Sequence, residues 1–160
     1  MNTLNTPDPD VEVLRLLVPI NANEDSRWGI RYALRRQREG RAVEVILLNV
    51  GEPITEWEVL RFRTQQEIAR FQEESAQRFI GEATAPLMTA SIPCRGIFRQ
   101  GELVFSILDS AEESGCHEIV MPRSMTGLSR CFSRDIVRAV KRGQRDIPVV
   151  AVDDDGMGVS

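Results

Sequence analysis

The chain has 160 residues, enough for one domain with a buried core and too few for two. Hydrophobic residues make up 42% of it, charged residues 28%, and the net charge of -4 provides no basic face for nucleic acid. Its apolar runs are shorter than the roughly 20 residues of a membrane-spanning helix, and residues 1–10 lack the features of a signal peptide. We therefore expect a cytoplasmic protein with no membrane partner.

The sulfur and imidazole groups of the chain do not predict a metal centre. Cys94, Cys116 and Cys131 are scattered and form no CxxC pair, which favours buried thiols in a reducing compartment over a disulfide scaffold. His117 is the only histidine, and one histidine beside one cysteine falls short of the roughly four ligands of a zinc site.

Apolar runs typical of buried strands alternate along the chain with amphipathic stretches typical of helices. The strands are expected at residues 13–20, 42–50, 92–99, 117–121 and 147–152, and the helices at 26–39, 54–83, 103–114 and 132–143. This alternation predicts one three-layer α/β domain over residues 13–152 with a parallel sheet. Residues 1–12 and the acidic, glycine-bearing residues 153–160 are expected to be disordered.

Two of these elements carry more detailed expectations. The long helix at 54–83 is expected to direct Ile68, Phe71 and Phe79 toward the core and to break near Gly81. The third strand contains Pro93 and Gly96, which favours a position at the edge of the sheet.

Several segments resemble the universal stress protein family. They are Val18-Pro19-Ile20-Asn21, where the family has V-P-x-D; Gly101, Ile107 and Ala111, which match a G-x5-I-x3-A pattern; Ile119-Val120-Met121; Thr126-Gly127-Leu128-Ser129-Arg130; and the final run Ile147–Val152. The resemblance covers residues 12 to 152. It implies a Rossmann-like five-stranded parallel sheet of order 3-2-1-4-5, and a homodimer in which the last strand, Pro148–Val152, pairs with its symmetry mate. An apolar edge strand with unpaired N–H and C=O groups would itself recruit a partner.

This strand order also implies a crevice at the carboxyl ends of strands one and four, where ligands bind in such sheets. The residues expected to line it are Pro19, Ile20, Asn21, Val50, Met121, Arg123, Ser124 and Arg134. Asn21 replaces the family's aspartate, so it keeps hydrogen-bonding capacity but loses the charge.

Nucleotide-binding members of the family carry a glycine-rich turn after strand four, and this chain departs from it. Pro122 replaces the first glycine and lacks an N–H, about Met125 replaces the second, and Arg134-Asp135 replaces the final Gly-Ser. Each change costs on the order of 1–3 kcal/mol, and two such losses take a micromolar ligand to millimolar. We therefore expect no bound cofactor and no ATP binding of the usual kind.

The arginines near this turn leave two interpretations open. Arg123, Ser124, Arg130 and Arg134 could hold the phosphate of ATP or AMP without a glycine loop, or these arginines could be solvated or paired with acidic groups. Catalysis is not expected, because the sole histidine lies at the opposite end of strand four and no P-loop or nucleophile motif is present. The sequence therefore predicts a non-catalytic binding or regulatory module in a stress response, with an unknown protein partner.

Overall fold

The computed structural model describes residues 12–52, 61, 63–123, 134–143 and 146–159. Its strands form one sheet in the order β3-β2-β1-β4-β5-β6. The strands are β1 (Leu14–Pro19), β2 (Val43–Gly51), β3 (Cys94–Gln100), β4 (Glu118–Pro122), β5 (Val149–Val152) and β6 (Gly158–Val159). The helices are the 3₁₀ helix η1 (Glu24–Arg27), α1 (Trp28–Arg38), α3 (Gln65–Thr89), α4 (Leu103–Glu113) and α5 (Arg134–Gly143).

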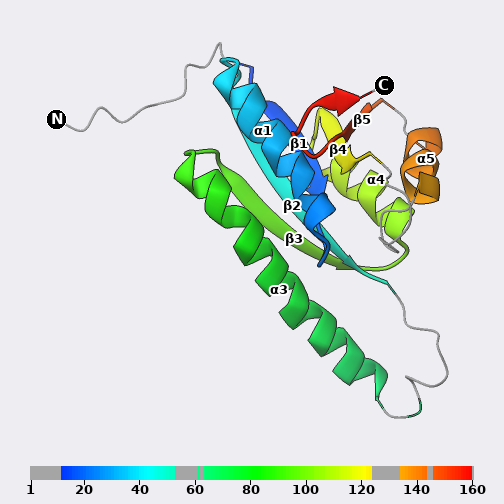
Figure 1. Cartoon of the computed structure of the whole chain (residues 1–160). Coiled ribbons are helices and arrows are strands. Elements are labelled where there is room, and N and C mark those ends of the chain that lie inside the picture. The colour runs from blue at the N-terminus through cyan, green and yellow to red at the C-terminus, as the bar shows by residue number, and fades with distance from the viewer. Residues whose placement is uncertain (1–11, 53–60, 62, 124–133, 144–145, 160) are drawn as a thin grey trace.

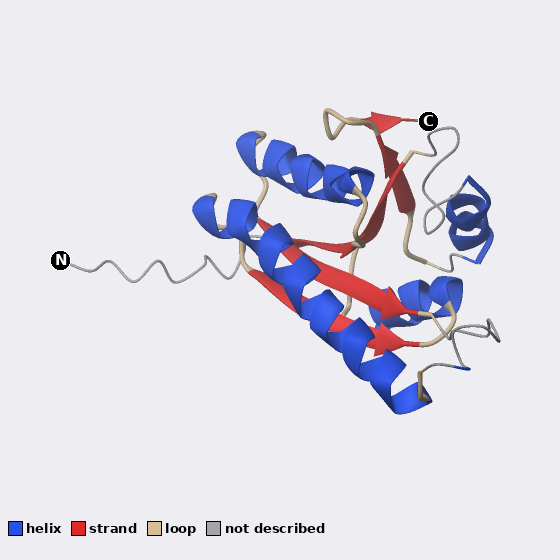
Figure 2. Ribbon diagram, turned by 60° about the horizontal axis from the view of Figure 1, so that its bottom comes forward, coloured by secondary structure: helices blue, strands red, loops and turns tan. Residues whose placement is uncertain are grey.

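The predicted three-layer arrangement and strand order are confirmed (Figures 1 and 2). Strands β1 to β5 pair in parallel, and β3 lies at an edge as Pro93 and Gly96 suggested. Because successive side chains of a strand point to opposite faces, β1 contributes to two cores. Leu16 and Val18 pack under α1 and α3, whereas Leu17 packs under α4 and α5.

The long helix differs from its prediction where the structure describes it. Residues 53–60, which include the expected start, lie outside the described residues; α3 begins at Gln65, with Thr64 as its N-cap, and runs unbroken through Gly81 to Thr89. The predicted break is wrong because Ala76, Ala83 and Leu87 bury the helix on both sides of Gly81, and this packing outweighs a glycine cost of about 1 kcal/mol.

The inward direction predicted for Phe71 is also wrong, since this side chain is 69% exposed. A helix of 25 residues spans about 37 Å, whereas the seven residues of β3 span about 23 Å. The first turns of α3 therefore extend past the ends of β2 and β3, as Figure 1 shows. Ile68 is nevertheless buried there, so Phe71 is exposed because it lies off the side of the helix that Ile68, Ala76, Ala83 and Leu87 bury.

The predicted disorder of the acidic tail is contradicted over residues 153–159. These residues form a turn and then β6, which pairs antiparallel with β5 through Ala151 opposite Val159 and Val152 opposite Gly158. Hence β5 is not the open edge strand that the sequence suggested. The expected disorder of residues 1–12 falls almost entirely outside the described part of the chain. Among the helices that the structure describes, none is long and apolar enough to cross a membrane.

Candidate functional site

The candidate site lies where β1 and β4 end side by side, and its first wall is the exit of β1. The backbone of Ile20 continues the ladder, because its N–H donates to the Leu48 carbonyl at 2.8 Å. The Ile20 carbonyl accepts a 2.8 Å hydrogen bond from Nδ2 of Asn49, a side chain that is only 8% exposed. This bond fixes the exit of β1 to β2.

Sequence reasoning overlooked Asn49. The signal was available, because Asn49 is a polar residue near the end of the apolar run 42–50, and a buried amide must find a partner.

Asn21 is the polar residue at the end of β1. Its Oδ1 accepts the N–H of Asn23 at 2.8 Å, and its own N–H donates to Oγ of Ser26 at 3.2 Å. Ser26 is fully buried and donates in turn to the Asn23 carbonyl at 2.7 Å. The amide Nδ2 of Asn21 is also buried, and no described residue accepts a hydrogen bond from it. The Oδ1 of Asn21 thus closes the loop after β1, and its Nδ2 is left as a hydrogen-bond donor.

Asp25 lies in η1, on the same loop. Its Oδ1 is buried without a hydrogen-bond partner among the described residues. Burial raises the pKa of its carboxyl group, the neighbouring Glu24 adds to the rise, and a backbone hydrogen bond from Ser26 opposes it. An acidic group at this position disfavours a phosphate close to the loop.

The second wall is the exit of β4, where the backbone is already engaged. Pro122 lies opposite Val152 in the β4–β5 register, and the N–H of Arg123 donates to the Val152 carbonyl at 2.6 Å. The side chain of Arg123 is exposed. The first residue after β4 therefore has an exposed side chain, but its N–H is already used in the sheet.

The predicted site residues divide into three groups. Pro19, Ile20 and Met121 are buried, and Met121 packs into the α4/α5 core rather than facing solvent. Asn21 and Val50 are half-buried, and Arg123 is exposed. Ser124 lies outside the described residues, as do Met125, Arg130 and the side chains of Arg134 and Asp135, although Arg134 is placed as the first residue of α5.

The histidine and one cysteine lie at the amino end of β4, away from the candidate site. Nδ1 of His117 accepts the N–H of Arg15 at 2.9 Å. Burial raises the pKa of the Cys116 thiol to about 11, so it remains protonated at neutral pH. Both side chains therefore lie at the opposite end of β4 from the exits that form the candidate site.

No protein-family model matches the sequence, and no curated protein matches it either. Solved structures do match. The hypothetical protein MJ0577 is 22% identical, with a TM-score of 0.67, over 88% of this chain and 95% of that one. A universal stress protein family member from Burkholderia pseudomallei is 16% identical, with a TM-score of 0.63, over 86% and 94%.

A further match is a universal stress protein family protein from Arabidopsis thaliana with AMP bound. It is 11% identical, with a TM-score of 0.58, over 88% of this chain and 90% of that one. This chain has the universal stress protein fold. The strand order from β3 to β5 inferred from the sequence agrees with that fold, and β6 extends it.

Proposed function

We propose that this chain is a non-catalytic binding and regulatory protein of the universal stress type. In this proposal it acts in the cytoplasm as a homodimer with a protein partner, and does not bind ATP as glycine-loop members of that family do. The proposal rests on one observation, the lack of available backbone N–H donors at the end of β4. Pro122 has no N–H, and the N–H of Arg123 is bonded to Val152, so two donors that would face a phosphate are absent or engaged.

The β1 exit supports the same conclusion. An aspartate at position 21 would offer a charged acceptor, whereas Asn21 offers only its Nδ2 donor once its oxygen has bonded Asn23. The half-buried Asp25 carboxyl group on the same loop opposes a triphosphate when it is charged. The crevice is therefore better suited to a neutral or weakly charged group than to ATP.

A second function is supported by a specific observation. The Nδ2 of Asn21, to which no described residue is bonded, and the exposed side chain of Arg123 could together hold a smaller nucleotide, with Ser124 and Arg134 completing the phosphate contacts. The AMP-bound structure from Arabidopsis thaliana shares this fold. In this alternative an arginine clamp replaces the glycine loop.

The test is to purify the protein without added nucleotide, denature it and identify released small molecules by mass spectrometry. Calorimetric titrations with ATP–magnesium and with AMP follow, on the unaltered chain and on Arg123→Ala. Arg138→Ala is the matched control, because Arg138 is an exposed arginine within α5. No released ligand and no heat support the nucleotide-free protein. A stoichiometric nucleotide whose binding is lost in Arg123→Ala but kept in Arg138→Ala establishes the clamp instead.

A further inference from the structure

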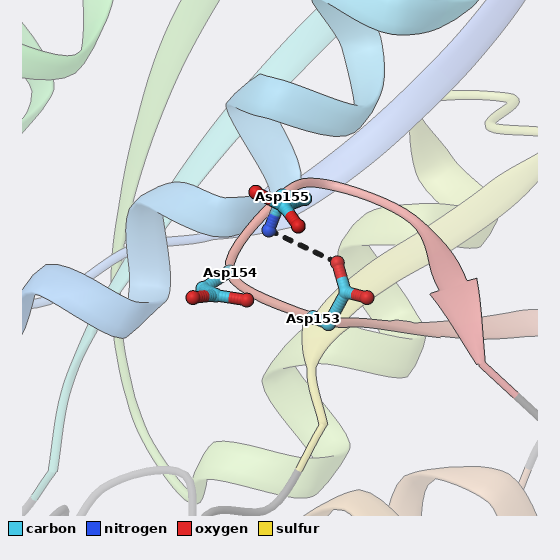
Figure 3. Close-up of side chains that lie close together, drawn as sticks. All are labelled: Asp153, Asp154 and Asp155. Atoms are coloured by element: carbon cyan, nitrogen blue, oxygen red, sulfur yellow. Dashed lines mark hydrogen bonds between the residues drawn. The ribbon is translucent and has the colours of Figure 1, made fainter.

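The segment after β5 is built as a closed turn rather than a loose tail. Oδ1 of Asp153 accepts the N–H of Asp155 at 3.0 Å (Figure 3). The same oxygen accepts the N–H of Met157 at 2.9 Å, and the Asp153 carbonyl accepts the N–H of Gly156 at 3.0 Å. The N–H of Asp153 donates to the Met157 carbonyl at 3.0 Å. Such side-chain bonds to the backbone specify a turn locally.

This turn is also docked against α1. Gly156 has a φ of +76°, and a Cβ there would lie 2.6 Å from two backbone atoms, the carbonyl carbon of Arg31 and the nitrogen of Tyr32. Nη1 of Arg31 donates to the Asp154 carbonyl, while its Nη2 pairs with Glu24. Because the close contact is with helix backbone, only glycine fits at position 156.

The docked turn holds β6 on the outer edge of β5. The pairing places Val159 opposite Ala151 and Gly158 opposite Val152. An uncovered strand edge offers N–H and C=O groups that recruit another strand. Because the Val152 carbonyl faces β4, where it accepts the N–H of Arg123, the backbone groups that β6 covers are those of Ala151, opposite Val159. As a strand of only two residues, β6 contributes few ladder bonds by itself, and its position depends on the contact between the turn and α1.

We propose that residues 153–159 form an intramolecular latch that competes with a second copy of this chain for the edge of β5. While the turn is docked on α1, β6 occupies the edge. When the turn is released, β5 becomes available for antiparallel pairing with the same strand of a second copy. The inference rests on the proposed homodimer through Pro148–Val152, and adds that the chain carries its own competitor for that interface.

The glycines of the latch provide a matched pair of variants. Gly156→Val places a branched side chain against the α1 backbone and should prevent docking. Gly158→Ala is the control, because its Cβ would meet only Cγ1 of Val150 at an ordinary 3.6 Å. A chain ending at residue 152 removes the latch without any substitution. Circular dichroism establishes that each variant is folded, and sedimentation velocity at several concentrations measures its mass.

We expect each of these chains to dimerise as its concentration rises, and Gly156→Val and the truncated chain to reach twice their monomer mass at lower concentrations than Gly158→Ala and the full chain, whose monomer mass is 18.0 kDa. If the full chain dimerises and neither Gly156→Val nor the truncation changes its dimerisation, the latch is refuted and the proposed homodimer is supported. Folded monomers of every variant at all concentrations would refute both. Hydrogen exchange of the Ala151 N–H, which faces β6, supplies a second measure: at concentrations where both variants are monomeric, the latch requires faster exchange in Gly156→Val than in Gly158→Ala.

Discussion

Replacing Asn49 with alanine tests how firmly the exit of β1 is held. The Asn49 amide is the donor to the Ile20 carbonyl at 2.8 Å, and both residues are buried. Removing it leaves that carbonyl without a partner away from water, which costs about 1–3 kcal/mol. For a domain of this size, each kcal/mol lowers Tm by about 2–4 °C.

Gln37→Ala is the matched control for this substitution. Nε2 of Gln37 also donates to a backbone carbonyl at 2.8 Å, that of Ala90, but the bond lies at a half-buried surface position where water can replace it. Urea unfolding of the two variants at neutral pH gives the difference directly. If Asn49→Ala lowers the free energy of unfolding no more than Gln37→Ala, burial is not what gives the Asn49 bond its strength, and the reasoning fails.

Three further predictions follow from the packing. A Cβ at Gly29 would lie 2.7 Å from Cγ1 of Val18, so Gly29→Ala should lower the free energy of unfolding in urea by about 1–3 kcal/mol. Gly81→Ala, with open space around its Cβ, should raise it by about 0.5–1 kcal/mol. Equal effects of the two substitutions would contradict the close contact at Gly29. Burial, with a hydrogen bond to a carboxylate, raises the pKa of Tyr32 from 10.0 to about 12. Because the folded state holds this proton more tightly, its contribution to stability is complete below about pH 10 and is lost as the pH rises toward about 12. Between about pH 10 and pH 12, the free energy of unfolding should fall less steeply with pH in Tyr32→Phe than in the unaltered chain. The same slope in both proteins would argue against a raised pKa for Tyr32. Cys116 in the native protein should resist alkylation by iodoacetamide at pH 8 and react after unfolding, as mapped by peptide mass spectrometry; equal labelling in both states would mean that the thiol is not buried.

The elements that could be predicted from the sequence are those with a continuous apolar signal. Residues 42–50 read as a strand buried on both faces, and β2 runs from Val43 to Gly51. Phe71 was placed on the wrong side because two of the residues that mark the buried side of α3 are alanines, Ala76 and Ala83, which give a weaker apolar signal than a phenylalanine. The acidic tail was misread because composition does not show that one aspartate accepts two N–H groups, nor that a glycine fits against a helix backbone.

The candidate site was predicted less completely, since its chemistry depends on which polar groups are already bonded. The sequence correctly indicated that Pro122 lacks a donor, but only the structure shows that the next N–H is used to extend the β4–β5 ladder to Val152. The departure from the glycine-rich turn therefore concerns backbone hydrogen bonding as well as side chains. A glycine at position 122 would restore one N–H and leave that of Arg123 bonded to Val152. Because Val152 also pairs with β6, releasing the Arg123 N–H toward a ligand would disturb the same end of β5 that the latch covers. In this chain the N–H that follows Pro122 is used to extend the β4–β5 ladder, next to the end of β5 that also pairs with β6.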